Sequence, residues 1–270
     1  MRIIVDHRTT YRYERPASAV VQALRLSPRD HDGQHVHSWR VDADVDGSMQ
    51  ESTDAFGNRL IMFYAEGALS SLTLTVTGEA EVTDTAGVIG AREPLPLPVF
   101  LRSTELTTPD GAIADLARDA THNDPLAMLH ALMTAIRDVM TFDVATTDSA
   151  TPAATAFAAR NGVCQDFAHI FCTAARLLDI PSRYVSGHLA RPGAEAQDAS
   201  HAWAEAHVPG LGWVAFDPAN GICATDAYLR IAVGLDYLDA APVRGARRGG
   251  GSERMAVEVR AERAQGQAQG

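Results

Sequence analysis

The sequence of 270 residues contains no lysine, because all 23 of its basic residues are arginine. Without lysine the chain cannot form a Schiff base, attach pyridoxal phosphate covalently or build a P-loop. The 34 acidic residues outnumber the basic ones, which gives a net charge of −11 and argues against a nucleic-acid-binding surface. The composition therefore excludes several enzyme classes and predicts that no nucleic acid is bound.

Cysteine is scarce as well: Cys164, Cys172 and Cys223 are the only three, and no two of them form a C-x-x-C pair. An odd, sparse set of this kind predicts neither a disulfide framework nor a zinc site. Long apolar runs are also missing, since no stretch reaches the roughly 18 residues of a membrane span and no signal-peptide run follows the charged start. We therefore expect a reducing, cytoplasmic location without a membrane partner.

Motifs for metals and cofactors are missing too. No Asp-rich loop has the ligand spacing of a calcium site, and neither H-E-x-x-H nor G-x-G-x-x-G occurs. His35 and His37 share one face of an expected strand, but Trp39 and Val41 share it too, which favours sheet histidines over metal ligands. We expect no metal and no other cofactor, and the sequence leaves the oligomeric state open.

Apolar and polar residues alternate in the first third of the chain, which is typical of half-buried strands. The strands expected from this alternation are residues 2–13, 35–45, 60–64 and 72–76. Residues 86–107 carry prolines at alternate positions and are expected to form an extended linker. We therefore predict a β-rich antiparallel domain over residues 1–95.

Helix signals follow the linker. Thr108-Pro109, Asp124-Pro125 and Thr151-Pro152 each resemble an N-cap with proline at the first helical position. A further helix should begin near Cys164. The later strands are expected at residues 183–189, 201–208, 213–217, 231–233 and 255–259. This order of strands, helices and strands predicts the α+β class, with a core over residues 108–262 that includes the C-terminal strands and a disordered tail over residues 263–270.

Cys164 is expected in the first turn of its helix. There the helix dipole and unpaired N–H groups favour a thiolate and can hold a developing oxyanion. The alternative for this residue, and still more for Cys172 and Cys223, is a small buried apolar side chain. A second observation is therefore needed to assign chemistry to Cys164.

That observation is the alternating segment from His201 to His207, which places His201, Trp203 and Glu205 on one face and three alanines on the other. A turn at residues 209–212 and a strand ending at Asp217 follow, so the two strands form a hairpin. Cys164, His201 and Asp217 then supply a nucleophile, a base and a carboxylate that orients the base.

Three blocks of sequence together resemble the core of the bacterial transglutaminase-like superfamily, which includes proteins named as cysteine proteases. They are N-G-V-C-Q-D-F-A at residues 161–168, S-H-A-W-A-E at residues 200–205 and G-W-V-A-F-D-P at residues 212–218. The β-rich first part is similar to the domain that precedes this core in bacterial members. The segment around residues 232–245 is similar to their C-terminal segment, with Leu235 where the family usually has arginine.

The resemblance implies a papain-like or transglutaminase-like core, in which the nucleophile lies at a helix N-terminus packed on an antiparallel sheet. It implies that Cys164 is the nucleophile, His201 the base and acid, and Asp217 the residue that orients His201. The substrate would be a peptide or another amide, cleaved through a thioester by water. Two alternatives stay open: protein-glutamine transamidation by an amine, and a non-catalytic binding module on the same fold.

The hairpin register tests this assignment. If Val208 paired with Trp213, Asp217 would point away from His201. An odd loop or a bulge that pairs Trp203 opposite Asp217 is therefore predicted, and Glu205 is the reserve candidate for the orienting carboxylate.

Other residues are weaker candidates. Asp166, Trp203 and Trp213 are possible substrate-binding residues; for Asp166, helix stabilisation is an equal alternative, and for the tryptophans packing is. His169 is expected to have a packing or surface role. The loop over residues 191–199 is expected to shape the substrate pocket.

Overall fold

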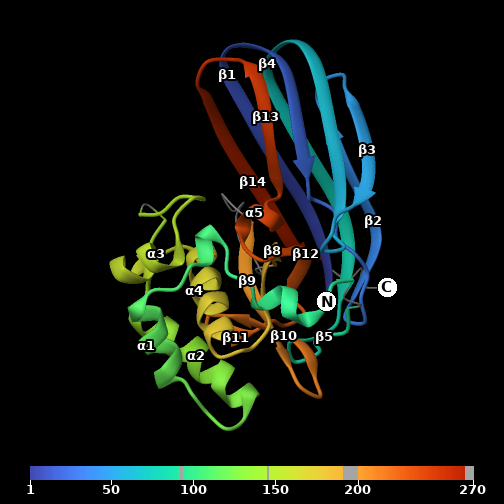
Figure 1. Ribbon diagram of the computed structural model, residues 1–270. Coiled ribbons are helices and arrows are strands. Elements are labelled where there is room, and N and C mark those ends of the chain that lie inside the picture. The colour runs from blue at the N-terminus through green and yellow to red at the C-terminus, as the bar shows by residue number, and fades with distance from the viewer. Residues whose placement is uncertain (92–93, 145, 191–199, 265–270) are drawn as a thin grey trace, which may run out of the picture.

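The computed structural model describes residues 1–91, 94–144, 146–190 and 200–264. A long antiparallel sheet rises as an arm from a core in which helices pack on a second sheet (Figure 1). This architecture confirms the α+β class that the order of elements predicts. No helix within the described ranges is long and apolar enough to cross a membrane.

The arm is built on two long strands, β1 (Arg2–Leu24) and β4 (Arg59–Val82), which pair with each other. Side chains of β1 alternate between exposed and buried from Arg2 to Tyr13, because one face of the sheet covers an apolar core. The two short strands expected at residues 60–64 and 72–76 are parts of the single strand β4. The other strands of the arm are β2 (Gln34–Ala43), β3 (Ser48–Thr53), β13 (Val243–Gly249) and β14 (Glu253–Arg263).

The C-terminal strands correct the predicted domain division. Both β13 and β14 pair with β1 in the arm, and neither joins the core that was expected to extend to residue 262. The physical reason is that β4 covers only one edge of β1, so its other edge can accept any antiparallel strand. Residues 265–270 of the predicted tail lie outside the described residues, whereas residue 263 ends β14.

The core sheet has the order β11-β10-β9-β8-β12. Its strands are β8 (Ser182–Leu189), β9 (His201–Val208), β10 (Gly212–Asp217), β11 (Ile222–Cys223) and β12 (Tyr228–Gly234). A short strand, β5 (Val88–Ile89), pairs with β10, so part of the predicted linker belongs to this sheet. Two further short strands, β6 (Thr141–Phe142) and β7 (Asn161–Gly162), pair in parallel just before Cys164.

Five α-helices and two 3₁₀ turns are described in the part of the chain that the structure covers. They are α1 (Gly111–Asp119), α2 (Pro125–Val139), α3 (Ala153–Ala159), α4 (Cys164–Leu177), α5 (Tyr237–Ala240), Leu97–Leu101 and Glu105–Thr107. The predicted cap Asp124 accepts hydrogen bonds from the N–H groups of Leu126 and Ala127. The cap of α1 is Asp110, two residues after the predicted Thr108.

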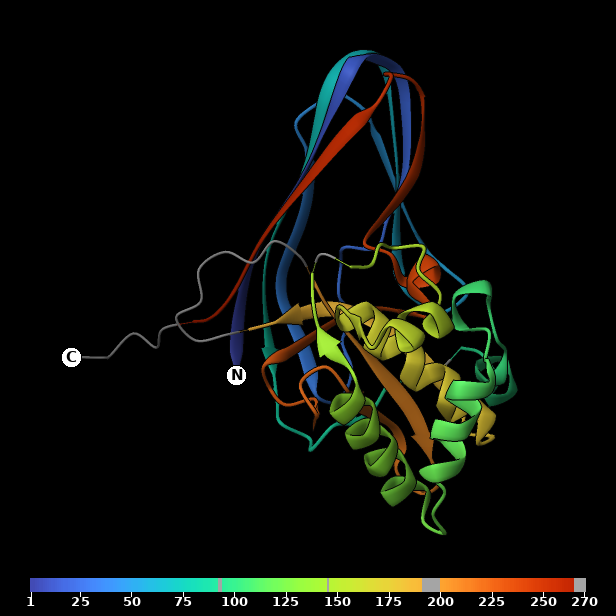
Figure 2. The same ribbon diagram turned by 90° about the vertical axis from the view of Figure 1, so that its left-hand side faces the viewer.

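Helix α4 is the centre of the core (Figure 2). Its apolar side chains pack on the alanine face of β9 and on Phe216 of β10, as the alternation in β9 predicts. The opposite face of the sheet is covered as well, so β8, β9 and β10 are buried almost throughout. Polar side chains on that face therefore need partners inside the protein.

Candidate active site

Cys164 is the first residue of α4, and the turn before it is held by Asp166. The Asp166 carboxylate accepts hydrogen bonds from the N–H of Val163 (2.8 Å) and from the hydroxyl of Thr147 (2.7 Å). A Cβ at residue 162 would lie 2.5 Å from this carboxylate, so the close approach requires Gly162. The thiol consequently sits at a fixed helix N-terminus, as the sequence predicts.

The hairpin brings Asp217 to the face of His201. Val208 pairs with Gly212 and Phe216 pairs with Ala204, so three residues form the loop. The positive φ angles of Gly210 and Gly212, 85° and 83°, allow that tight connection. Continuing the register sets Asp217 opposite Trp203, which confirms the predicted odd loop.

The three predicted catalytic side chains lie next to one another in the order Cys164, His201 and Asp217. Nε2 of His201 lies 2.6 Å from Oδ2 of Asp217, and the thiol of Cys164 is near enough to the imidazole to raise its pKa. Since Nε2 is occupied by Asp217, Nδ1 is the ring nitrogen that remains for the thiol. Burial lowers the pKa of His201, but its hydrogen bonds and attraction to Asp217 and Cys164 outweigh burial and raise the pKa to about 9.

Asp217 is enclosed by donors. Its Oδ2 accepts hydrogen bonds from the hydroxyl of Tyr228 (2.7 Å) and the amide of Asn220 (2.6 Å), and its Oδ1 accepts from the N–H groups of Ala219 (3.0 Å) and Asn220 (3.1 Å). Burial raises the pKa of Asp217, but the hydrogen bond and charge of His201 and the other donors hold it below its ordinary value. The carboxylate is therefore ionised and fixed in orientation.

Sequence reasoning missed Tyr228 and Asn220. Asn220 could have been found, because Asp217 is followed by Pro218 and Asn220. This composition is typical of a turn in which an Asp side chain accepts hydrogen bonds from backbone N–H groups two or three residues later. Tyr228 lies on a different strand, and no spacing in the sequence connects it with Asp217.

Exposure is graded along the line of three residues. Cys164 is partly exposed, His201 is 8% exposed and Asp217 is fully buried. The thiol can therefore meet a molecule from outside while water is kept from the carboxylate, which strengthens their electrostatic interactions.

Glu205, the reserve candidate, is engaged elsewhere. It accepts hydrogen bonds from Arg183 (2.6 Å) and Arg230 (2.7 Å), and the Glu205 side chain is fully buried. Burial raises the pKa of Glu205, but the two guanidinium charges outweigh it and lower the pKa to about 2. Asp217, and not Glu205, is the carboxylate that reaches His201.

The predicted substrate-binding side chains are buried. Asp166 is fully enclosed at the start of α4, and Trp203 and Trp213 are 1% and 3% exposed. The Trp203 ring stacks beside His201, and the Arg183 guanidinium lies over Trp213 at 3.9 Å from the ring centre. None of the three offers surface to a bound molecule, so a substrate contact finds no support in the geometry. The predicted pocket loop, residues 191–199, lies outside the described residues.

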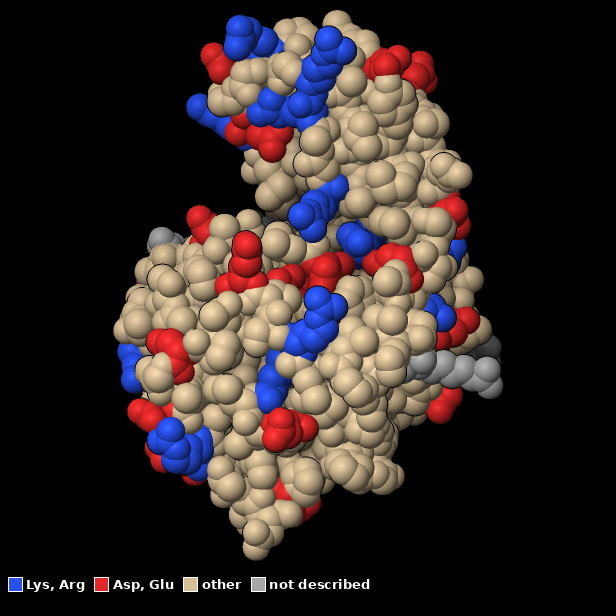
Figure 3. Space-filling view, viewed as in Figure 1, with Lys and Arg blue, Asp and Glu red and all other residues tan. Residues whose placement is uncertain are grey.

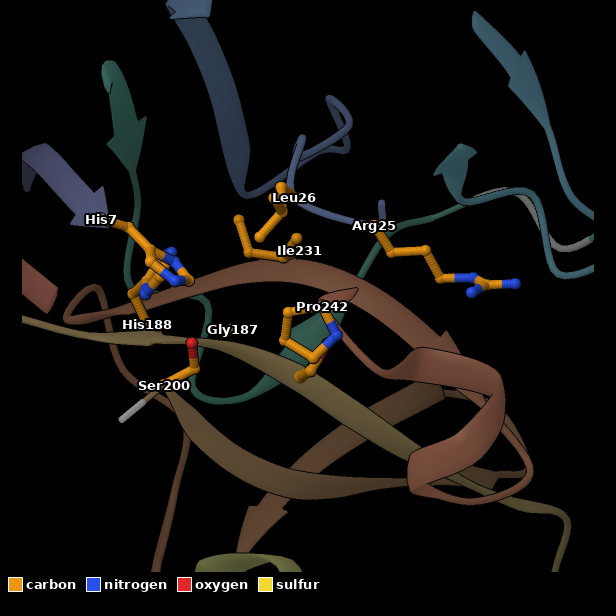
Figure 4. A pocket seen from close by; sticks show the side chains of 9 residues that line it. His7, Arg25, Leu26, Gly187, His188, Ser200, Ile231 and Pro242 are labelled. Atoms are coloured by element: carbon orange, nitrogen blue, oxygen red, sulfur yellow. The ribbon is translucent and has the colours of Figure 1, made fainter. Parts of the chain in front are cut away.

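Three other histidines are buried. His169 is fully buried and its Nε2 accepts the N–H of Tyr237 at 3.0 Å. His7 and His188 meet edge to face beside a small cavity between the two sheets (Figure 4). Burial lowers the pKa of His7 to about 4 and that of His188 to about 3. Within the described ranges no three His, Cys, Asp or Glu side chains are grouped for a metal.

Leu235, where the resemblance predicts arginine, packs with Phe100 and Trp213. Its carbonyl accepts a hydrogen bond from the buried guanidinium of Arg176 (2.7 Å).

On the face shown in Figure 3, a hollow separates the arm from the core, and acidic and arginine side chains lie near each other along it.

Comparisons with known families agree with the geometry. A family model described as the transglutaminase-like superfamily matches residues 114–218, which contain all three predicted catalytic residues. A second model, the bacterial transglutaminase-like N-terminal region, matches residues 3–81. Together they cover strands β1 to β4 of the arm and the part of the core up to β10.

Relatives and solved structures extend the match over the chain. Uncharacterized protein ML0607 of Mycobacterium leprae (strain TN) is 30% identical, with 96% of this chain and 97% of the relative covered. Uncharacterized protein Rv2569c of Mycobacterium tuberculosis is 29% identical, with 90% and 87% covered. The crystal structure of a "Putative Cysteine Protease" from Cytophaga hutchinsonii has a TM-score of 0.76 at 20% identity, covering 98% of this chain and 92% of that one.

Proposed function

The chain belongs to the transglutaminase-like superfamily, and on that premise we propose that it is a cysteine-dependent enzyme that transfers the acyl group of an amide. The observation that carries the proposal is the hydrogen bond of His201 to the buried Asp217, beside the thiol of Cys164 at the N-terminus of α4. The substrate is a peptide or another amide, and water is the acceptor. No cofactor takes part.

The first half-reaction forms a thioester. His201 holds the proton of the thiol as an imidazolium, which Asp217 stabilises, and the Cys164 thiolate attacks the amide carbonyl. The N–H of Cys164 lies in the first turn of α4, where backbone donors have no partner within the helix, so it can bind the oxyanion. His201 then gives its proton to the leaving amine, and the C–N bond breaks.

The second half-reaction resolves the thioester. His201, now neutral, takes a proton from water; the hydroxide oxygen bonds to the acyl carbon, and the Cys164 sulfur leaves and recovers the proton from His201. An amine in place of water would give transamidation by the same steps. The chain has no lysine, so it cannot supply such an amine from a side chain of its own, and water is the simplest acceptor.

A binding module on this fold is the competing function. It would have no use for an ionised carboxylate held by four donors behind a histidine that contacts a thiol. The arrangement of Asp217, His201 and Cys164 therefore favours catalysis.

The proposal is tested by trapping the thioester. The purified protein is incubated with an activated acyl ester and then with candidate peptides, and the adduct is located by mass spectrometry after acid quench. We expect one acyl group on Cys164 and none on Cys172 or Cys223, and loss of the adduct in His201→Ala. Acylation spread equally over the three cysteines, or unchanged in His201→Ala, would refute the proposal.

Two further outcomes refine it. Release of free acid supports hydrolysis, whereas incorporation of an added primary amine supports transamidation.

We also propose a cytoplasmic location, which agrees with three cysteines that are all free and which cell fractionation can test.

A further inference from the structure

Strand β12 is at the edge of the core sheet. Its inner edge pairs with β8, and its outer edge faces the N-terminal part of the chain without a partner strand among the described residues. Most of β12 is buried. Backbone N–H and C=O groups on such an edge need partners, because an unpaired buried group is costly.

Two amide side chains of the N-terminal part take the place of the missing strand. Oε1 of Gln34 accepts the N–H of Arg230 (2.8 Å), and its Nε2 donates to the C=O of the same residue (3.0 Å). Oδ1 of Asn58 accepts the N–H of Val233 (2.8 Å), and its Nδ2 donates to the C=O of Val233 (2.7 Å). Each amide reproduces the two-bond exchange of an antiparallel residue pair.

A bulge in β12 sets the spacing of these contacts. The register with β8 shifts between Arg230 and Ala232, so one extra residue separates the outward-facing backbone groups. Arg230 and Val233 then both face outward, three positions apart instead of two. The two amides match that spacing.

Both amides are themselves held in place. Gln34 is 2% exposed and donates a further hydrogen bond to the C=O of Arg29 (2.8 Å). Asn58 is 3% exposed and donates to the carboxylate of Asp54 (3.0 Å). Buried amides with this many bonds are built to hold one orientation.

Strand β12 in turn holds the candidate active site. Tyr228 is its first residue, and the Tyr228 hydroxyl donates to Oδ2 of Asp217 at 2.7 Å. The Tyr228 ring lies 5.9 Å from that of His201. Arg230 also binds Glu205, which lies on the strand of His201. A displacement of β12 would therefore reach Asp217 and His201 directly.

We propose that Gln34 and Asn58 are positioning residues of the active site: by holding the edge of β12 they keep Tyr228 and Asp217 in line with His201. The N-terminal domain is then a working part of the enzyme. The inference rests on the proposed function, because it concerns how the pair of Cys164 and His201 is maintained.

The readout is the ratio of the alkylation rates of Cys164 at pH 6.5 and pH 9.5. The titratable groups that face His201 are Cys164 from α4, Asp217 from β10 and Tyr228 from β12. The pKa of His201 is raised to about 9 by its partners, so the imidazolium that Asp217 supports is present at pH 6.5 and largely lost at pH 9.5. The ratio therefore reports the support of His201 and cancels general changes in access.

The variants are Gln34→Met and Asn58→Leu, which keep the volume of the side chain and remove its hydrogen bonds. We expect each to lower the rate ratio by about threefold to tenfold, because each variant removes both hydrogen bonds that its amide makes to β12. Val20→Ala is the matched control. Val20 is buried in the apolar core of the arm, and that cluster contains no residue of β12. It should lower the melting temperature and leave the ratio unchanged.

A fall in melting temperature with an unchanged ratio in both amide variants would overturn the inference, because it would mean a structural role only. If these variants do not fold, Gln34→Glu and Asn58→Asp retain the acceptor for the strand N–H and are measured in the same way, with the same two outcomes deciding. Tyr228→Phe removes the hydrogen bond to Asp217 directly. A fall of the rate ratio in Tyr228→Phe, but in neither amide variant, overturns the positioning role. A wild-type Cys164 that is no more reactive at pH 6.5 than Cys223 refutes the proposed function.

Discussion

On one face of β9, His201 and Glu205 lie four residues apart, and each is the centre of a buried polar cluster. The cluster of His201 contains groups that can exchange a proton near neutral pH, and it reaches a partly exposed thiol. The cluster of Glu205 contains two guanidinium groups, and it is sealed from solvent apart from Arg230. The same strand therefore carries a proton-transfer site and a fixed-charge site.

Buried charge has a different role in each cluster. Around Glu205 the charges are permanent and are matched by fixed partners, so the cluster can hold strands together. Around His201 the charge is conditional, because the imidazole is charged only while it keeps its proton. If this comparison is correct, variants in the Glu205 cluster should change the stability of the fold, and variants in the His201 cluster should change the reactivity of Cys164.

The largest effect is expected for Asp217→Asn. The amide keeps the shape of the carboxylate but cannot stabilise the imidazolium, so acylation of Cys164 by an activated ester should slow on the order of 10⁴-fold. Stopped-flow measurement of the burst rate gives the value, and the far-UV spectrum shows that the fold is retained. A loss below tenfold would mean that Asp217 does not orient His201.

The next effect is expected for Glu205→Gln. Arg183 would remain charged and fully buried without its carboxylate, so the free energy of unfolding should fall by about 3–5 kcal/mol. Glu51→Gln is the matched control, because Glu51 pairs with Arg59 at 3.2 Å on the surface and should lose no more than about 1 kcal/mol. Equal losses in the two variants, measured by urea unfolding, would erase the distinction between the clusters.

The pH dependence of stability should also separate the clusters. The pKa of His201 is raised to about 9 in the folded protein, so its stabilisation is complete below its ordinary value near 6.5 and is lost as the pH rises through 9. The loss should be about 3 kcal/mol between those pH values, and His201→Asn should remove it. Glu205, whose pKa is lowered to about 2, loses its stabilisation only as the pH falls through its ordinary value toward 2. The free energy of unfolding is measured in urea from pH 6 to pH 10 for the wild type and for His201→Asn. An equal decline in the two proteins would contradict the assigned role of His201.

The smallest effect is expected for Asp166→Ala. This change removes the acceptor for the N–H of Val163 at the start of α4, and a lost helix cap reduces stability by about 1 kcal/mol. Asp124→Ala at the start of α2 is the matched cap far from the thiol. Both variants should lose similar stability in urea, and only Asp166→Ala should also slow the alkylation of Cys164. Equal alkylation rates would show that Asp166 serves the helix alone.

Local patterns predicted much of this arrangement from the sequence. The alternation in residues 201–208 identified the strand of His201, and the parity of the hairpin loop placed Asp217 on its face. The start of α4 at Cys164 followed from helical spacing and the turn before it. These features depend on residues close together in the chain.

Long-range pairing could not be predicted in the same way. Strands β13 and β14 join β1 across more than 200 residues, and an open antiparallel edge carries no mark of which strand it accepts. The contacts of Tyr228 with Asp217, and of Gln34 with β12, depend on that tertiary arrangement. For Trp203 and Trp213 the sequence left packing and substrate binding equally open, because strict alternation does not reveal that both faces of the core sheet are covered.

The most direct test of the central claim is the rate at which iodoacetamide alkylates Cys164 at pH 6.5 in the wild type and in His201→Ala, resolved by peptide mass mapping. We predict rapid labelling of Cys164 in the wild type and a loss of at least about tenfold in the variant, because the imidazolium no longer stabilises the thiolate. Cys223, whose thiol pKa is raised by burial, serves as the internal control and should react slowly in both proteins. Equal rates at Cys164 in the two proteins would contradict the assignment of this site as a cysteine–histidine catalytic centre.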